Sequence, residues 1–222
     1  MNNTEILDLS GDCTASLPNY PKELDGATGQ FLDDKIIICG GGFFLGVLGN
    51  YSDCFILRKG ESSFESFPSM KEARIQAKSV VTQGRIWVTG GIQFYGLNYT
   101  ILSSTEYIPN NSSNEPILPE PLCYHAIISI NDTTSMLIGG VTNGNDLPSS
   151  KTHYFNHLSQ TWKSGPRLMN GRATHTAGII MDHATHEQHI AVVGGTLESD
   201  MNTSSDSVEL LLNGETQWTE GI

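Results

Sequence analysis

The chain has 222 residues, a formal net charge of −12 and only 12 Lys and Arg residues, which are dispersed. This charge argues against a nucleic-acid partner, because phosphate binding requires clustered basic side chains. No apolar run approaches the roughly 20 residues that cross a bilayer, and the opening MNNTEILDLSGD has neither the basic start nor the apolar centre of a secretory signal. We therefore expect no membrane span and no signal in this stretch.

Taken in chain order, the sequence predicts short strands separated by turns. TEILDL and TASLP, within residues 1–20, predict two strands. GATGQFLD, KIIICGG, SDCFILR and SSFESFP follow within 25–68, and QAKSVVTQ, RIWVTGG, SSTEYIP and NEPILP within 75–119. YHAIISIN, SMLIGG, KTHYFN and TWKSGP lie within 123–166, and THTAGIIMD, HIAVVGG, SVELLL and TQWTEG within 173–220. Four short antiparallel strands in about 45 residues form one twisted sheet, or blade, of an all-β propeller, so we predict four blades after a leading half-blade in one domain, 1–222.

The second strand of every predicted blade ends in two glycines. The first glycines are 50, 49 and 55 residues apart (40 to 90, 90 to 139 and 139 to 194), which indicates a repeat architecture. Glycine lets the backbone take positive φ and lets neighbouring atoms approach closely. We therefore predict buried second strands and a structural role for Gly40, Gly41, Gly90, Gly91, Gly139, Gly140, Gly194 and Gly195.

Large aromatic residues recur on the third and fourth strands. Tyr107 and Tyr154 lie on third strands, with Phe55 in the corresponding place of the first blade. Trp162 and Trp218 lie on fourth strands, where the first blade has Phe64 or Phe67. We expect these side chains to close over the small diglycines and to fill the core between neighbouring blades.

This combination resembles the kelch repeat, in which an apolar strand ends in Gly-Gly and is followed by a Tyr, a Trp, a Pro and an Arg. The resemblance covers nearly the whole chain, and PSMKEARIQAKSVV (68–81) and PRLMNGRATHTAGII (166–180) match the usual link between blades. It implies that Arg74 and Arg172 are structural residues that bridge blades. The second blade departs from the pattern with Leu118 where a Trp is expected, and the fourth has Leu210–Leu212 in the aromatic strand's place.

Kelch propellers generally close with more blades than four, most often six. The half-blade within 1–20 implies pairing with inner strands that the sequence does not supply. We therefore predict an incomplete ring with open edges.

Candidate catalytic groups are few. HATHEQH (183–189) lies where a turn is expected and lacks His-Glu-x-x-His spacing, so a solvated turn is favoured over a metal site. His125 and His175 begin inner strands near the predicted channel, as ordinary strand histidines or as ligand contacts. Galactose oxidase has kelch-type blades, but its copper chemistry needs a Cys–Tyr linkage that no arrangement of the four cysteines supports. We expect no catalytic residue, metal or cofactor.

The cysteines and sequons bear on the compartment. Cys39 ends a predicted second strand and Cys54 lies on the predicted third, so they could face each other across an antiparallel pair, either as a disulfide or as buried thiols, while Cys13 and Cys123 have no assigned partner. The frequent Asn-x-Ser/Thr triplets arise either by chance in a turn-rich sequence or from a secreted glycoprotein. Both extracellular and cytoplasmic locations stay open, with the sequons favouring the first. The candidate glycosylation sites are Asn50, Asn98, Asn111, Asn131 and Asn202, besides Asn2 and Asn110.

The loops after the diglycines are the predicted functional surface, because the strands of a propeller form its core. Two of these loops carry more apolar bulk than solubility requires, and the side chains either bind a protein partner or fold back onto their own blade. The candidate partner-binding residues are Phe43, Phe44, Leu45, Phe94, Tyr95, Leu97 and Tyr99. We predict a non-catalytic protein-binding module, with three alternatives: an extracellular adhesion or matrix protein, the substrate-recognition propeller of a ubiquitin-ligase adaptor, or a fragment of a galactose-oxidase-like enzyme.

Overall fold

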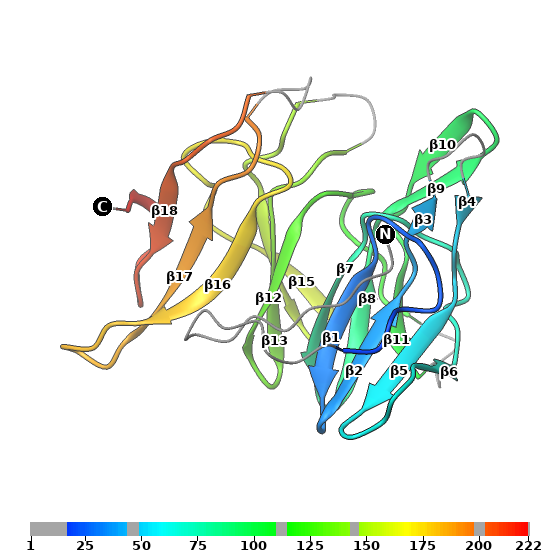
Figure 1. Cartoon of the computed structure of the whole chain (residues 1–222). Coiled ribbons are helices and arrows are strands. Elements are labelled where there is room, and N and C mark those ends of the chain that lie inside the picture. Colours follow the sequence, from blue (N-terminus) through cyan, green and yellow to red (C-terminus); the bar gives the residue numbers. More distant parts are fainter. Residues whose placement is uncertain (1–16, 44–48, 110–114, 143–146, 198–202, 222) are drawn as a thin grey trace.

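The computed structural model describes residues 17–43, 49–109, 115–142, 147–197 and 203–221. Regular structure in these residues is entirely β, and it forms four antiparallel sheets that follow one another along the chain (Figure 1). None of these residues belongs to a helix, so none forms a helix that would cross a membrane.

Within each sheet the strands are arranged in chain order, and in sheets 1 and 2 a short hairpin is inserted between two of the strands. Sheet 1 consists of β1 (Thr28–Leu32), β2 (Lys35–Cys39), β5 (Cys54–Arg58) and β6 (Glu65–Phe67). Sheet 2 consists of β7 (Lys78–Thr82), β8 (Arg85–Thr89) and β11 (Thr105–Ile108). Sheet 3 consists of β12 (Ala126–Asn131), β13 (Thr134–Ile138), β14 (Thr152–Asn156) and β15 (Thr161–Ser164). Sheet 4 consists of β16 (Thr176–Met181), β17 (Gln188–Val193), β18 (Val208–Leu211) and β19 (Thr219–Glu220).

Two hairpins extend from this framework, and two predicted elements are missing from it. The hairpins are β3 (Gly42–Phe43) with β4 (Gly49–Asn50), and β9 (Ile92–Tyr95) with β10 (Asn98–Ile101). Residues 115–119 of the predicted fourth strand of sheet 2 do not form a strand. The predicted half-blade lies outside the described residues except for its end, where Leu17 packs with Tyr20 against the outer face of sheet 1.

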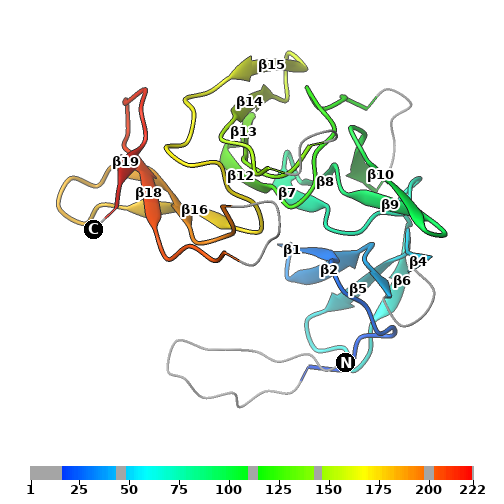
Figure 2. The same ribbon diagram turned by 90° about the horizontal axis from the view of Figure 1, so that it is seen from above.

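The sheets are arranged around a common axis. The innermost strands β1, β7, β12 and β16 lie side by side in this order at the centre (Figure 2). The four sheets face one another in sequence, as in a propeller, and the described residues do not form a closed ring.

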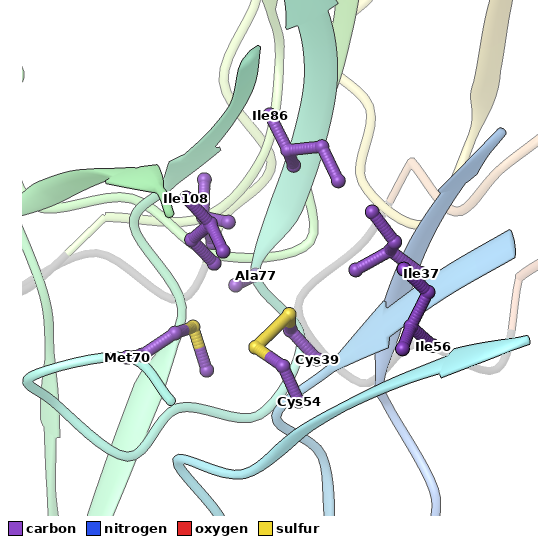
Figure 3. Packing of buried hydrophobic residues seen from close by; sticks show 9 residues of the cluster. Ile37, Cys39, Cys54, Ile56, Met70, Ala77, Ile86 and Ile108 are labelled. Carbon is purple, nitrogen blue, oxygen red and sulfur yellow. A yellow bond between two sulfur atoms is a disulfide. The ribbon is translucent and has the colours of Figure 1, made fainter. Parts of the chain in front are cut away.

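Apolar side chains from facing sheets fill the spaces between them. Ile37 and Ile56 of sheet 1 pack with Ile86 and Ile108 of sheet 2 beside the disulfide (Figure 3). Between sheets 2 and 3 the fully buried Trp87 stacks on Phe155, with ring centroids 4.8 Å apart. Between sheets 3 and 4 the core consists chiefly of Met136, Ile138, Val192, Leu211 and Trp218.

The diglycine strands β2, β8, β13 and β17 are interior strands of their sheets, as predicted. Residues 86–89 and 136–138 are fully buried, whereas Ile36 and Ile38 of β2 are half-buried. Most of the predicted burial is therefore confirmed. Val193 is the exception, because 42% of its surface is exposed.

Gly90 explains why these strands end in glycine. Its φ is +58°, and a Cβ atom there would lie 2.1 Å from the carbonyl oxygen of Leu122, in the link to the next sheet. The following N–H, of Gly91, donates to the same oxygen at 2.8 Å. The link therefore passes directly against the diglycine, and a side chain would displace it. The same contacts join Gly40 and Gly41 to Arg74, and Gly139 and Gly140 to Arg172.

Gly194 lacks this contact. A Cβ atom there would approach nothing closer than the Ser205 carbonyl at 3.4 Å, and the Gly195 N–H has no acceptor among the described residues. The residue before each diglycine shows the same difference between the sheets. Cys39, Thr89 and Ile138 are at most 2% exposed, whereas Val193 is 42% exposed. No described segment therefore covers the outer face of sheet 4.

The aromatic side chains differ from expectation in register and in contact. Tyr107 pairs with Trp87 and Tyr154 with Met136, and the corresponding pair in sheet 1 is Ile56 with Ile37. Phe55 is one residue out of register and points to the opposite face, where it meets Tyr20. No aromatic side chain of a third or fourth strand is among the atoms nearest to the diglycines, so the predicted closure over them is wrong. The predicted filling of the spaces between sheets is confirmed for Tyr107, Tyr154, Trp162 and Trp218.

The two leucine departures have separate outcomes. Leu118 is the counterpart of Leu168 rather than of a Trp, because their N–H groups donate to the equivalent carbonyls of Ser103 and Ser150. It is 4% exposed and packs with Leu122. Leu210 takes the Tyr position of sheet 4, on the face that no described sheet covers.

Candidate functional site

At the end of the sheets that carries the diglycines, the hairpin β9–β10 has the most exposed large apolar side chains among the described residues. It follows Gly90 and Gly91 directly and projects beyond sheet 2 (Figure 1). Tyr95 pairs with Asn98 across its tip, and the Phe94–Tyr99 pair lies below. The exposed fractions are 59% for Tyr95, 96% for Leu97 and 56% for Tyr99. Three large side chains therefore face solvent on one short hairpin.

The other candidate partner-binding residues behave differently. Phe43 is half-buried. Phe94 is also half-buried and packs against the cluster around Ile75, beneath the hairpin. Phe44 and Leu45 lie outside the described residues. The Phe94 side chain therefore folds back onto its own blade, whereas the side chains of Tyr95, Leu97 and Tyr99 face solvent.

Asn50 braces this hairpin. Its Nδ2 donates to the Phe94 carbonyl at 2.9 Å, and its Oδ1 accepts from the Phe94 N–H at 2.9 Å. The side chain therefore joins β4 to β9 as an additional backbone partner would. Since an N-glycan is attached through Nδ2, a glycan on Asn50 is incompatible with this pair of bonds.

Two other predicted glycosylation sites are accessible. Asn98 is exposed on the hairpin itself, next to Tyr99. Asn131 is exposed in the β12–β13 turn, where its Oδ1 accepts from the Thr133 N–H at 3.0 Å and leaves Nδ2 unused among the described contacts. Asn2, Asn110, Asn111 and Asn202 lie outside the described residues.

The two link arginines lie inside the molecule. Arg74 donates to the Gly90 carbonyl at 2.8 Å and to Glu106 at 2.7 Å. Arg172 donates to the Gly194 carbonyl at 2.8 Å and to Glu209 at 2.6 Å. Through these bonds each arginine joins a link to the sheet that follows. Both side chains are fully buried, so a ligand cannot reach them.

The histidines divide into buried and exposed groups. His125 is fully buried, its Nε2 lies 2.8 Å from Thr89 Oγ1, and burial lowers its pKa to about 3. His183 and His186 are exposed in the β16–β17 turn, and His189 Nδ1 accepts from the Asn213 N–H at 3.1 Å. The part of the chain that the structure describes contains no group of three or more metal-ligating side chains.

Cys39 and Cys54 form a disulfide across β2 and β5, with Cα atoms 4.1 Å apart. The equivalent pairs are Thr89 with Thr105 in sheet 2 and Ile138 with Thr152 in sheet 3. The bridge therefore replaces a buried non-covalent pair. Cys123 is a buried free thiol whose pKa burial raises to about 12, and Cys13 lies outside the described residues.

Three relevant residues had no clear signal in the sequence. Glu106 and Glu209 are the partners of the link arginines, 32 and 37 residues further along the chain from Arg74 and Arg172. Their only sequence signal is a carboxylate in the middle of an apolar third strand. Lys78, at the start of β7, follows a link like any surface lysine and still lies at the centre of the molecule.

Comparison with known proteins supports the fold and nothing finer. No family model and no curated protein sequence matches the chain. Among solved structures, one described as the structure of YjhT superimposes with a TM-score of 0.70 over 93% of this chain and 67% of that one, at 16% identity. At this identity the likeness shows a shared propeller-like arrangement of antiparallel sheets.

Proposed function

We propose that the chain is a non-catalytic protein-binding module built from kelch-type blades. The observation that carries this proposal is the exposed triad of Tyr95, Leu97 and Tyr99 on a braced hairpin. Aromatic residues contribute disproportionately to protein interfaces, and a hairpin held by Asn50 loses little conformational entropy on binding. Support for kelch-type blades comes from the diglycine period and from the two buried link arginines.

We further propose that the complete propeller has more blades than the four described. The diglycine at 194–195, which contacts no following link among the described residues, and the exposed Val193 support this, because the equivalent positions of sheets 1 to 3 are covered by a following sheet. The YjhT structure is consistent with it, since a third of that chain lies outside the match.

Among the alternative settings, the extracellular one has the most support. A Cys39–Cys54 disulfide is typical of an oxidising compartment. Asn98 and Asn131 are sequons with exposed side chains. Glycan mass on the protein isolated from its native cell would support this setting, and glycan-free protein with reduced cysteines would contradict it.

The test of binding replaces the triad with Tyr95→Ser/Leu97→Ser/Tyr99→Ser. Proteins captured from the native tissue by this variant and by the unaltered chain are compared by quantitative mass spectrometry. The matched control is Leu158→Ser, since Leu158 is 71% exposed in the β14–β15 turn at the opposite end of the sheets. We expect a partner that the control retains and the triple variant loses. Identical partner sets for all three proteins would refute this surface.

A further inference from the structure

A polar hollow is lined by residues at the starts of β1, β7, β12 and β16. These four strands lie side by side at the centre of the arrangement (Figure 2). The volume of the hollow is about 260 Å³, and its lining residues lie at the end of the sheets that carries the diglycines. None of the residues that line it is acidic, although the chain carries a net charge of −12. Its polar lining comes from Thr28, Gln30, Lys78, Ser79, His175 and Thr176.

Lys78 is the only lysine or arginine in this lining. It is half-buried, and no described residue accepts a hydrogen bond from its ammonium or forms an ion pair with it. Burial lowers the pKa of Lys78, because removal from water disfavours the charged form. The ammonium is therefore partly desolvated without a counter-charge from the described residues.

The hydroxyl groups of the lining have unused donors. Thr28 Oγ1 and Ser79 Oγ lie 2.7 Å apart, and one proton is enough for this hydrogen bond. The other hydroxyl proton has no acceptor among the described residues. Gln30 Nε2 donates to the Ser79 carbonyl at 2.8 Å, which fixes Ser79 in place. Thr176 is exposed and its hydroxyl makes no hydrogen bond with a described residue.

His175 lies in the same lining and is buried there without a charge. Its counterpart His125 is paired with Thr89, but His175 faces Ile138 at the equivalent position and has no side-chain partner. The ring is 4% exposed, and neither nitrogen makes a well-aligned hydrogen bond. Burial, Arg172 and Lys78 lower the pKa of His175 to about 4, although the Ile138 carbonyl opposes them. The ring is therefore neutral at pH 7, and Lys78 is the only charged side chain in the lining.

We propose that this hollow is a carboxylate-binding site, in which Lys78 supplies the charge and the free hydroxyl donors of Ser79 or Thr28 and of Thr176 orient the group. One ammonium with hydroxyl donors matches the single negative charge of a carboxylate. A dianionic phosphate would keep an uncompensated charge here, since no arginine fork lines the hollow. The carboxylate belongs either to a small organic acid or to an acidic side chain of a polypeptide. This site is separate from the hairpin triad and does not depend on the proposed protein-binding function.

The test uses the whole chain labelled with ¹³C at lysine Cε and with ¹⁵N at the backbone amides, at constant ionic strength maintained with chloride. The Lys78 signal is the one that disappears in Lys78→Met. Acetate is the probe for a free acid, and a hexaglutamate peptide is the probe for a polypeptide. We expect one of them to shift the Lys78 signal saturably, with a midpoint in the millimolar range, and to raise the Lys78 pKa by on the order of one unit.

Two variants accompany these titrations. In Lys78→Met, the amide shifts that either probe causes around Thr176 should be lost, while Lys35→Met should keep them, because Lys35 lies on β2 outside the hollow. Thr176→Val removes an exposed hydroxyl with little risk to folding and should weaken binding several-fold. If Lys78→Met does not melt cooperatively, and so does not fold properly, Thr176→Val still tests whether the hollow binds the probe.

The outcomes are decisive in both directions. Saturation by acetate alone identifies a small acid, and saturation by hexaglutamate alone identifies an acidic segment; either supports the site. No saturable shift with either probe, or shifts around Thr176 that persist unchanged in Lys78→Met, would overturn it. Loss of the hairpin's partner would leave this result unaffected, so the two proposals fail separately.

Discussion

The guanidinium of Arg172 and the carboxylate of Glu209 form a buried ion pair, with Nη2 and Oε1 2.6 Å apart. Glu209 also accepts hydrogen bonds from the N–H groups of Met169 and Asn170 at 2.7 and 3.1 Å. One carboxylate is therefore the acceptor for an arginine and for two backbone N–H groups of the link. Arg74 and Glu106 repeat this arrangement between sheets 1 and 2. The ion pairs therefore attach the link between sheets 1 and 2 to sheet 2, and the link between sheets 3 and 4 to sheet 4.

Removal of one charge should be costly because it leaves the other buried without a partner. We expect Glu209→Gln to lower the free energy of unfolding by about 3 kcal/mol. Glu215→Gln, at an exposed position, should change it by under about 0.5 kcal/mol. Urea titrations followed by circular dichroism measure both, and equal effects would contradict the structural role of the pair.

Sheet 1 supplies a natural replacement for the pair. Leu24 and Phe55 occupy the positions of Arg172 and Glu209 there and pack together in an apolar cluster. Arg172→Leu/Glu209→Phe should therefore be more stable than Glu209→Gln alone, since it leaves no unpaired charge. A double variant less stable than the single one would show that the two environments are not interchangeable.

The disulfide offers a second prediction. Its cysteines are 15 residues apart, and a closed loop of this length contributes about 3 kcal/mol by restricting the unfolded chain. Reduction with dithiothreitol should lower the free energy of unfolding by this order. Cys39→Thr/Cys54→Thr reproduces the pair in sheet 2, so it should fold, match the reduced protein in stability and show no response to dithiothreitol. A response in the variant would mean that dithiothreitol acts elsewhere.

Sequence reasoning found the sheets because their spacing depends on backbone geometry. Each link passes so close to a diglycine that only glycine fits, and this constraint appears as a visible period. Side-chain orientation was harder to predict, as Phe55 shows. A shift of one residue moves a strand side chain to the opposite face, and the sequence alone did not reveal that Ile56 takes the tyrosine position.

The candidate site divides in the same way. Exposed bulk on the β9–β10 hairpin could be predicted, because the turn at Gly96 separates two short apolar segments. The contribution of Asn50 could not, since it lies 44 residues from Phe94 in the sequence. Lys78 could not be placed at the centre either, because its surroundings are assembled from all four sheets.

Acid sensitivity follows from three buried histidines. Burial lowers the pKa of His125 to about 3, and of His157 and His175 to about 4. In the unfolded chain each titrates near 6.5. The unfolded state therefore binds more protons below this value, so the stability is fully present above pH 7 and is lost as the pH falls from about 6.5 towards 4.

His157 provides the variant for this prediction. Its ring lies 2.8 Å from both the Tyr107 hydroxyl and the Ser135 hydroxyl, and it joins sheets 2 and 3 as a neutral group. Between pH 7.5 and 5.5 each histidine should remove about 1 kcal/mol from the free energy of unfolding. His157→Gln should lower the stability at pH 7.5 and reduce the dependence on pH by about one third. A flat profile for the unaltered chain would contradict buried neutral histidines.

Trp162 tests the packing between sheets 2 and 3. Its ring centroid lies 4.6 Å from that of Phe155 and 5.9 Å from that of Trp87. Its Nε1 donates to the Ile117 carbonyl at 2.9 Å. Trp162→Ala should cost about 3 kcal/mol or more because it leaves a cavity and an unpaired carbonyl. His183→Ala, in the exposed turn, should cost under about 0.5 kcal/mol. Similar denaturant midpoints for the two variants would show that the ring does not contribute to this core.

The outer face of sheet 4, which no described segment covers, predicts self-association of residues 1–222. Ile180 and Val193 are each 42% exposed on the outer face, whereas the counterparts of Val193 are buried beneath a following sheet. The Gly195 N–H also has no acceptor among the described residues, while Gly91 and Gly140 donate to a link at 2.8 Å. An apolar sheet face with an open donor favours contact with another copy, so the sedimentation coefficient should rise with concentration.

Ile180→Lys/Val193→Lys should suppress this rise, because burying two ammonium groups between copies costs more free energy than the contact gains. Leu158→Lys places one ammonium group on a side chain that is 71% exposed in the β14–β15 turn, and it should leave association unchanged. Both variants should melt as cooperatively as the unaltered chain, since neither changes a contact between sheets. A monomer at all concentrations, with cooperative melting, would show that this face is covered from within the chain and that the four sheets form a self-sufficient unit.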